Sequence, residues 1–489
     1  MHRYATSRPP SKLPPSPTPD TLGIATVHPR RNIRPELILP LLDPSPTAVY
    51  RGKFTADHAT RLLWRAGFGP RPGEAERLAK LGMEAAVASL TRPRGAARLI
   101  GAAPHDDHGQ PLDPTNTWGD DHCWWLDRMV RSDQQLIERM TLIWHSWFAT
   151  SEEASSAQLM IRQNWMMRRH ALGNFHQLLL DVTIDPAMLL WQNGNTNNKD
   201  SPNENYGREM LELFTLGADR GYDQHDVHQN ARALTGWTND WNEQGPVSFR
   251  FEPSLHDDGL KRIFGHRGRF NWRDSCRLAV NHPDHPSFLV DKLWGYLVGA
   301  KIPRATARAL ERKYRQSGYE IRPLVEAILR HPLFYEGPRL VIPPVVWTAG
   351  LLRGSRQTIT TTSWAWIAQL TGQVLFQPPN VSGWDYAQWL DTSRWAGRLE
   401  AVNVALENHV IKGKTYPYGL TENAVHAYQH AVDFWGGRPL SDTARHNLIT
   451  LGRRIARGQT QEWEQVSFRQ LRQNALRVLI PMTPDWMTA

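Results

Sequence analysis

A short charged segment, residues 203–212, holds the residue types that acid–base or metal chemistry requires. Ser201 and Pro202 predict the start of a helix near residue 202, and Gly217 predicts its end. At about 100° per residue, the polar residues of such a helix gather on and beside one face: Asn203, Glu204, Asn205, Arg208, Glu209 and Glu212.

Two interpretations of this polar face remain open. In the first, it is a solvated surface with an i, i+4 ladder of Glu204, Arg208 and Glu212, in which each pair contributes about 0.2–0.5 kcal/mol. In the second, it packs against another helix, and its carboxylates bind a metal ion or transfer protons. Spacing alone favours the surface. Asn203 and Asn205 favour the second interpretation, because asparagine is a poor helix former and suggests specific hydrogen bonds.

Three further places carry candidate groups. The next predicted helix, residues 224–235, starts at Asp223 and carries Asp226 and Arg232 away from its apolar stripe. Three His-x-x-His pairs, of which one lies at residues 225–228, lack the context of a zinc protease and are interpreted as chance. His145 lies in an aromatic helical segment, where a histidine is more often a core residue than a ligand.

The chain contains 21 tryptophans, most of them beside other apolar residues in helical patterns, where core packing is expected. Trp384 and Trp389 differ, because they lie in a loop near residues 376–395 that is rich in Pro, Gly and Asn. We interpret these two as candidates for lining a pocket. No phosphate-binding loop, dinucleotide fingerprint, serine nucleophile elbow or CxxC pair occurs, so nucleotide, serine hydrolase and iron–sulfur chemistry are unsupported.

Composition indicates a globular protein with a core, since 40% of the 489 residues are apolar and 21% are charged. Of the net charge of +9, more than half falls in residues 1–53, which hold eight Lys or Arg and three Asp or Glu. This basic tail is interpreted as a solubilising leader; nucleic-acid binding rests on charge alone and is disfavoured. No apolar run follows the arginine pair at residues 30–31, so no standard export signal is predicted, which favours the cytoplasm.

The predicted fold is mainly α-helical. Residues 1–50 hold 11 of the 35 prolines and should be a disordered tail. Residues 51–400 are expected to form a large multi-helix domain, with long helices at 122–148 and 155–182 and one small hairpin pairing 247–251 with 260–264. Residues 401–489 are expected to be a helical extension packed on that domain. No run of about 20 apolar residues that would span a bilayer occurs.

Several strings in this order resemble one bacterial family. They are "RLLWRAGFGPRPGEAERLAKLG" (61–82), "LIWHSWFATS" (142–151), "PNENYGREMLELFTLGADRGYDQHDVHQNARALTGWT" (202–238), "HDDGLKRIFGHRG" (256–268), "DKLWGYLV" (291–298) and "PPNVSGWDYAQWLDTSR" (378–394). The chain resembles the domain of unknown function 1800 (DUF1800) family over roughly residues 55–400. The resemblance implies a mainly helical fold and no established activity. It places the family's polar positions at Arg65, His145, Asn203, Glu204, Asn205, Arg208, Glu209, Glu212, Asp226, Arg232, His256, Asp257 and Lys261.

The resemblance also implies a context. Family genes often neighbour those of a sulfatase- or phosphatase-like protein, often with a twin-arginine signal, which is compatible with export and suggests a partner. One departure from the family pattern is "VIPPVV" (341–346), where a lysine and an acid would be expected. If those two groups belong to an active site, this chain is altered there.

Two functions follow as hypotheses. The first is an acid–base or metal-assisted hydrolase acting on an envelope or extracellular polymer, with a divalent metal as a compatible cofactor. Its catalytic residues would be His145, Glu204, Arg208, Glu209, Glu212 and Asp226. Its substrate-binding residues would be Asn203, Asn205, Arg232, His256, Asp257, Lys261, Trp384 and Trp389. The second is a non-catalytic scaffold for the co-encoded protein, in which the same charges form a structural network.

Overall fold

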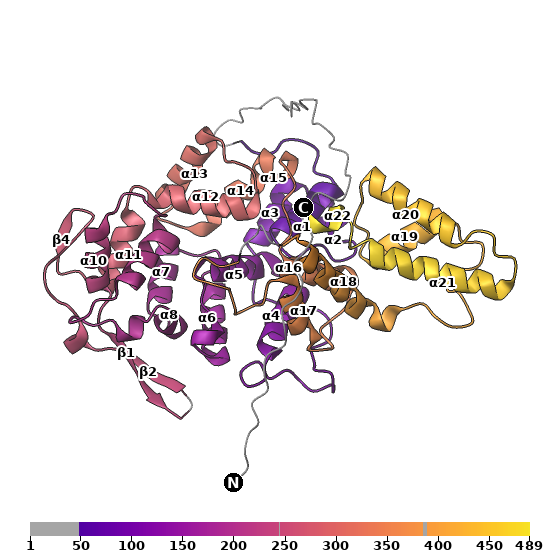
Figure 1. The fold of residues 1–489 in the computed structure, drawn as a ribbon. Coiled ribbons are helices and arrows are strands. Elements are labelled where there is room, and N and C mark those ends of the chain that lie inside the picture. The colour runs from indigo at the N-terminus through magenta and orange to yellow at the C-terminus, as the bar shows by residue number, and fades with distance from the viewer. Residues whose placement is uncertain (1–47, 244, 385–388) are drawn as a thin grey trace, which may run out of the picture. The chain divides into compact units, whose positions relative to one another are not determined.

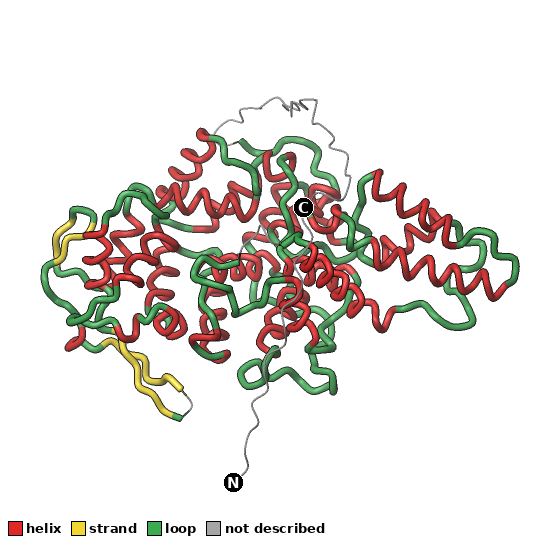
Figure 2. The backbone as a smooth tube through the Cα atoms, viewed as in Figure 1, coloured by secondary structure: helices red, strands yellow, loops and turns green. Residues whose placement is uncertain are grey.

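The computed structural model describes residues 48–489 except for residue 244 and residues 385–388. Most of the predicted disordered tail, residues 1–50, therefore lies outside the described residues. Within them the fold is mainly helical, as the sequence predicts, and the strands form two short hairpins (Figure 1, Figure 2). No helix in this part of the chain is long and apolar enough to cross a lipid bilayer.

The helices have the following bounds in chain order. The first half of the chain contains α1 (Ala56–Arg65), α2 (Glu74–Leu81), α3 (Met83–Thr91), α4 (Asp120–Arg131), α5 (Gln135–Trp147), α6 (Ala157–Arg169), α7 (Phe175–Thr183), α8 (Pro186–Trp191), α9 (Glu204–Glu209) and α10 (Gln224–Ala233). The second half contains α11 (Trp272–Asn281), α12 (His285–Leu297), α13 (Arg304–Gln316), α14 (Ile321–Arg330), α15 (Pro332–Glu336), α16 (Pro344–Gly354), α17 (Ser363–Thr371), α18 (Thr392–Leu406), α19 (Ala424–Phe434), α20 (Asp442–Ile455), α21 (Glu462–Leu479) and α22 (Pro484–Met487).

Both predicted long helices are wrong, because each is broken in two. The segment 122–148 divides at residues 132–134, between α4 and α5. There the carbonyl oxygens of Val130 and Ser132 accept hydrogen bonds from the buried guanidinium of Arg353, at 2.8 and 3.3 Å. A side chain from elsewhere thus satisfies carbonyls at the helix end. The segment 155–182 divides before α7, where Asn174 caps the new helix by accepting from the Gln177 amide.

The predicted hairpin is also wrong in its pairing. The structure contains two hairpins, β1 (Trp237–Asn242) with β2 (Gly245–Phe251), and β3 (Lys261–Ile263) with β4 (His266–Gly268). The sequence pattern missed β1, because its polar residues include Asn and Asp, which are depleted in strands. The strand β2 therefore pairs with a neighbour in sequence, and β3 pairs with the segment that follows it.

Two large groups of buried apolar residues form the interior. One group includes residues of α1, α3, α5, α7, α12 and α14, and Cys276 of α11 belongs to it. The other includes residues of α4, α16, α18, α19 and α21, and Cys123 of α4 belongs to it. Both cysteines are free and fully buried, and burial raises the pKa of each thiol. Each group of core residues therefore contains one buried thiol.

Residues 401–489 form helices α19, α20 and α21, which pack on one another, and α18 contacts α21. The chain then returns to α1, and the rings of Trp64 and Trp486 meet edge to face with centroids 5.7 Å apart. The backbone of Ala489 exchanges two hydrogen bonds with Leu340, at 2.7 and 2.8 Å. The last residues are thereby joined to the segment that precedes α16.

Candidate functional site

The charged helix predicted from the sequence is α9, and its first turn is capped by an asparagine. Asn203 Oδ1 accepts from the Tyr206 amide at 3.1 Å, and Asn203 Nδ2 donates to the Gln192 carbonyl at 2.8 Å. The cap is therefore Asn203 and not Ser201, and its side chain is engaged by the backbone. Asn205 extends toward the same segment, with Nδ2 3.5 Å from Gln192 Oε1.

A glycine sets the distance between α9 and α10. A Cβ atom on Gly207 would lie 2.9 Å from the Ala231 amide nitrogen and 2.9 Å from the Val227 carbonyl oxygen. Asn230 Nδ2 donates to the Gly207 carbonyl at 3.0 Å, and Asn230 Oδ1 accepts from Ser275 Oγ. The two helices thus meet backbone to backbone, so the polar side chains of α9 lie beside those of α10.

Glu204 binds two residues of α10. Its Oε1 lies 2.8 Å from His228 Nδ1, and its Oε2 accepts from Gln224 Nε2 at 2.6 Å. Arg208 donates to the Oε1 of the same Gln224. The side chains of Glu204 and His228 are 43% and 45% exposed, so this is a half-solvated surface cluster that joins two helices. Sequence reasoning missed His228, because its His-x-x-His pair was interpreted as chance.

The helix continues beyond Glu209 as a π-helical turn, η4 (Met210–Thr215). Thr215 Oγ1 donates to the Met210 carbonyl at 2.7 Å, five residues earlier. Glu209 and Glu212 are half-buried, and burial, together with the charge of Glu212, raises the pKa of Glu209. Such turns are often found at functional positions.

Lys292 of α12 reaches this π-helical turn, and sequence reasoning missed it. Its Nζ donates to the Leu213 carbonyl at 3.2 Å and lies 4.3 Å from the centre of the Trp147 ring. Burial lowers the pKa of this amine to about 7. The available signal was its position in an apolar, aromatic string at residues 291–298, where a lysine is unusual.

Asp226 on the first turn of α10 is used by the backbone. One oxygen accepts from the Phe264 amide at 2.7 Å, and the other accepts from the Asp223 amide in a capping box. This carboxylate therefore joins α10 to the end of β3. His256 Nδ1 donates to the Thr235 carbonyl at 2.9 Å, and burial lowers the pKa of its ring.

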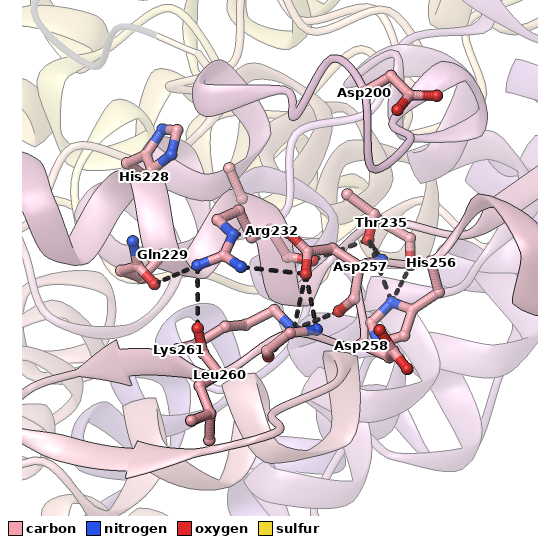
Figure 3. A network of polar contacts seen from close by, with 12 residues as sticks. Asp200, His228, Gln229, Arg232, Thr235, His256, Asp257, Asp258, Leu260 and Lys261 are labelled. Atoms are coloured by element: carbon pink, nitrogen blue, oxygen red, sulfur yellow. Dashed lines mark hydrogen bonds and ion pairs between the residues drawn. The ribbon is translucent and has the colours of Figure 1, made fainter.

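Arg232, Asp257 and Lys261 point toward one another between α10 and the β3–β4 hairpin (Figure 3). Arg232 binds Asp257 through two hydrogen bonds of 2.6 and 3.0 Å, and Lys261 Nζ lies 3.7 Å from Asp257 Oδ1. Arg232 also donates to Gln229 Oε1, and Lys261 donates to the carbonyls of Asp257 and Gly259. The Lys261 side chain has no solvent exposure. All three groups are thus bonded to the protein itself.

The pKa values in this cluster follow from burial and pairing. Burial acts to raise the pKa of Asp257, but the hydrogen bond from Arg232 and the other cationic contacts outweigh it, so the pKa is lowered. Burial lowers the pKa of Lys261, against the charge of Asp257. The carboxylate form of Asp257 is therefore the form that this cluster stabilises.

His145 lies in a different surrounding. Its ring packs against Trp125, Phe376 and Trp384, with centroids 5.3, 5.6 and 5.4 Å away. Burial lowers its pKa to about 3, and its Nε2 atom is buried without a hydrogen-bond partner among the described residues. None of its ring contacts there involves α9 or α10. Glu138, which lies two turns before His145 on α5, binds two arginines of α4 and α6.

A carboxyl pair that sequence reasoning missed lies near the aromatic rings that surround His145. Asp121, one turn before Trp125 on α4, is hydrogen-bonded to Glu152, whose amide donates to the Phe376 carbonyl at 2.8 Å. Burial, aided by the charge of Glu152, raises the pKa of Asp121 to about 7. Trp384 and Trp389 are both buried, so they do not form an open aromatic surface.

The donor groups do not form a metal site in the described part of the chain, since no three His, Cys, Asp or Glu side chains there are grouped to hold an ion. Glu204 and His228 supply two donors. The string "VIPPVV" contains the buried start of α16, where the Val345 amide donates to Gln373 Oε1 at 3.0 Å.

The chain matches a model of a protein family. A model described as "Protein of unknown function (DUF1800)" matches residues 61–488, nearly the whole chain, and so extends beyond the region of resemblance that the strings indicated. The comparisons with curated proteins and with solved structures give no match.

Proposed function

Since this chain belongs to the DUF1800 family, whose description names no activity, we propose a function from its own geometry: it is a non-catalytic partner protein. The observation that carries this proposal is the bonding of the charged cluster at α10. Arg232, Asp257 and Lys261 bind one another and neighbouring carbonyls, and Lys261 is fully buried. Groups bonded in this way hold segments of a fold in register and are not available to a substrate.

A separate apolar surface is available for a partner. On α21, Phe468, Leu471 and Leu479 are spaced three and eight residues apart, which places them along one side of the helix. All three are exposed, as is Trp463 in the first turn. Exposed apolar groups that line up on a helix are typical of protein-binding surfaces. The proposed occupant is the co-encoded sulfatase- or phosphatase-like protein implied by the family context.

A matched pair of leucines tests this surface. Leu471 and Leu260 are 53% and 54% exposed, but only Leu471 lies on α21. The full chain and the co-encoded protein are to be expressed together and analysed by size-exclusion chromatography with light scattering. Leu471→Glu should abolish co-elution, whereas Leu260→Glu should leave it unchanged. Absence of a complex with the wild-type chain, or equal behaviour of both variants, would contradict the proposal.

One specific observation favours a second candidate function, an acid–base hydrolase of an envelope or extracellular polymer. The 2.8 Å contact between Glu204 and His228 Nδ1 fixes the ring so that Nε2 is the free nitrogen. A carboxylate that orients a histidine in this way suits it to act as a general base. Glu209 at the end of α9 and Lys292 of α12 lie next to the π-helical turn that follows α9.

This candidate function is tested with chromogenic acyl esters, phosphate esters and glycosides as substrates. His228→Gln should abolish turnover, and His225→Gln, a neighbouring exposed histidine, should retain it. Glu204→Gln should shift the pH profile, because the ring loses its orienting charge. Turnover that is equal in His228→Gln and wild type would exclude His228 as the base.

A further inference from the structure

The positive charge of the chain is concentrated in two stretches of sequence. Residues 1–53 carry a net charge of +5, and residues 301–330 contain eight Lys or Arg and three Asp or Glu, which again gives +5. Since the whole chain has a net charge of +9, the rest of the sequence carries a net charge of −1. The second stretch contains α13 and α14, so its charge belongs to the described fold.

Helix α13 presents most of this charge to solvent. It contains five basic residues and one acidic residue, Glu311, which is half-buried. Its apolar side, with Leu310 and Tyr314, belongs to the core, and the helix contacts α12 and α14 (Figure 1). Four exposed arginines, spaced four, four and three residues apart, lie in a row along the opposite side: Arg304, Arg308, Arg312 and Arg315.

Neighbouring acids do not neutralise this row of arginines. None of the four forms an ion pair among the described residues. On the adjoining helices, Glu326 of α14 binds Arg92 at 2.7 Å, and Asp291 of α12 lies 4.0 Å from Arg220. The charge of α13 therefore remains available to an anionic surface, at distances up to a Debye length of about 8–10 Å.

A largely apolar cavity lies beside the row. Its volume is 380 Å³, within the range of about 300–1,000 Å³ that is typical of ligand sites. Its apolar lining includes Val49, Ala309, Leu310 and Ala327. Arg312 of the row also lines the cavity, so the exposed cations and the apolar space adjoin each other.

The cavity keeps a positive charge at its edge. Its other basic lining residues are Lys313 and Arg330, and no acidic side chain lines it in the described part of the chain. Arg330 is neutralised, because it lies 2.8 Å from Glu84 and 3.8 Å from Glu326. Lys313 is exposed and, like Arg312, forms no ion pair among the described residues. Two uncompensated cations thus border an apolar space.

We propose that α13 docks on the surface of a bilayer that contains anionic lipids, and that the apolar chain of one lipid enters the cavity. Rows of arginine on a helix bind anionic headgroups, and guanidinium groups are well suited to their phosphates. The cavity favours a lipid over a nucleic acid, because a lipid joins an anionic headgroup to an apolar chain and a nucleic-acid backbone does not. The surface is separate from the apolar side of α21 and lies outside the function proposed above.

Flotation of the full chain with lipid vesicles tests the proposal. The protein should float with vesicles of phosphatidylcholine and phosphatidylserine in equal parts, and not with phosphatidylcholine alone. Added salt should reduce flotation, because it screens exposed charges. Since each basic residue near an anionic bilayer strengthens binding roughly fivefold, Arg304→Gln, Arg308→Gln and Arg312→Gln together should weaken binding at least tenfold.

Helix α20 provides a matched control. Its Arg445, Arg453 and Arg454 are exposed and form no ion pair among the described residues. Arg445→Gln, Arg453→Gln and Arg454→Gln together remove the same charge from a helix that does not line the cavity, and this variant should bind the vesicles as the wild type does. Circular dichroism of each variant verifies folding.

Two further measurements test the cavity and the competing partner. Ala327 is half-buried and lines the cavity, so Ala327→Trp should fill it and weaken binding to the same vesicles. Double-stranded DNA, added at an equal concentration of anionic charge, should not displace the protein from the vesicles. Absence of flotation, equal losses in the two triple variants, unchanged binding of Ala327→Trp, or displacement by DNA would overturn the proposal.

Discussion

Neutralising Asp257 should weaken the fold far more than neutralising the aspartate next to it. Asp257 accepts two hydrogen bonds from Arg232 and one from the Gly259 amide, and lies 3.7 Å from the buried Lys261 amine. Asp257→Asn keeps the shape of the side chain but leaves two cations without a counter-charge. Breaking a buried pair costs about 3–5 kcal/mol. Because Arg232 and Asp257 retain 21% and 16% exposure, we expect the lower end, about 3 kcal/mol.

Asp258 provides the control. It pairs with Arg269 at 3.5 Å, and the two side chains are 88% and 69% exposed, so Asp258→Asn should cost at most about 1 kcal/mol. Urea denaturation followed by tryptophan fluorescence measures both variants, and hydrogen exchange at the Phe264 amide reports local opening of β3. A loss for Asp257→Asn no larger than that for Asp258→Asn would refute the reasoning that this cluster holds the hairpin to α10.

Two further outcomes are expected. Gly207→Ala should lower the melting temperature, because its Cβ would lie 2.9 Å from the backbone of α10, and such overpacking costs about 1–3 kcal/mol. Gly295→Ala has open space around its Cβ and should raise the free energy of unfolding by up to about 1 kcal/mol. Equal shifts of the melting temperature in the two variants would contradict the close backbone contact between α9 and α10. Burial raises the pKa of Asp121 to about 7, so its carboxyl group in the folded protein is protonated at pH 5 and charged at pH 8. The stability that this group contributes is therefore lost as the pH rises through 7. In calorimetric melting, Asp121→Asn should raise the melting temperature above that of the wild type by more at pH 8 than at pH 5, whereas the exposed control Asp200→Asn should have the same effect at both pH values. An effect of Asp121→Asn that does not depend on pH would contradict the raised pKa.

The helical character of the chain could be predicted because it depends on local signals. Asp223 caps α10 as expected, with Asp226 completing the capping box. Such patterns involve residues within one or two turns of each other. The break between α4 and α5 involves instead Arg353, which lies more than 200 residues further along the chain. No local pattern contains that contact, so the sequence predicted one continuous helix there.

In the candidate site, too, the positions of residues within one helix could be predicted, whereas their contacts with other segments could not. The sequence placed Glu204 and Arg208 on one polar face, but their bonds run to Gln224 and His228 of the next helix and not along α9. The contact of Arg232 with Asp257 joins residues 25 apart and depends on how the β3–β4 hairpin folds back. Family strings marked both residues as polar positions without indicating that they pair. The catalytic and substrate-binding roles assigned to these residues stay predictions.

The two free cysteines can report when each part of the protein interior opens. Cys276 and Cys123 lie in different groups of core residues, and a thiol-specific reagent can reach either one only when the surrounding helices separate. Labelling rates at the two positions, resolved by mass spectrometry of peptides, would report the opening of each region independently. Equal rates under mild denaturant would mean that the two halves of the interior unfold as one cooperative unit. Unequal rates would identify which helices open first.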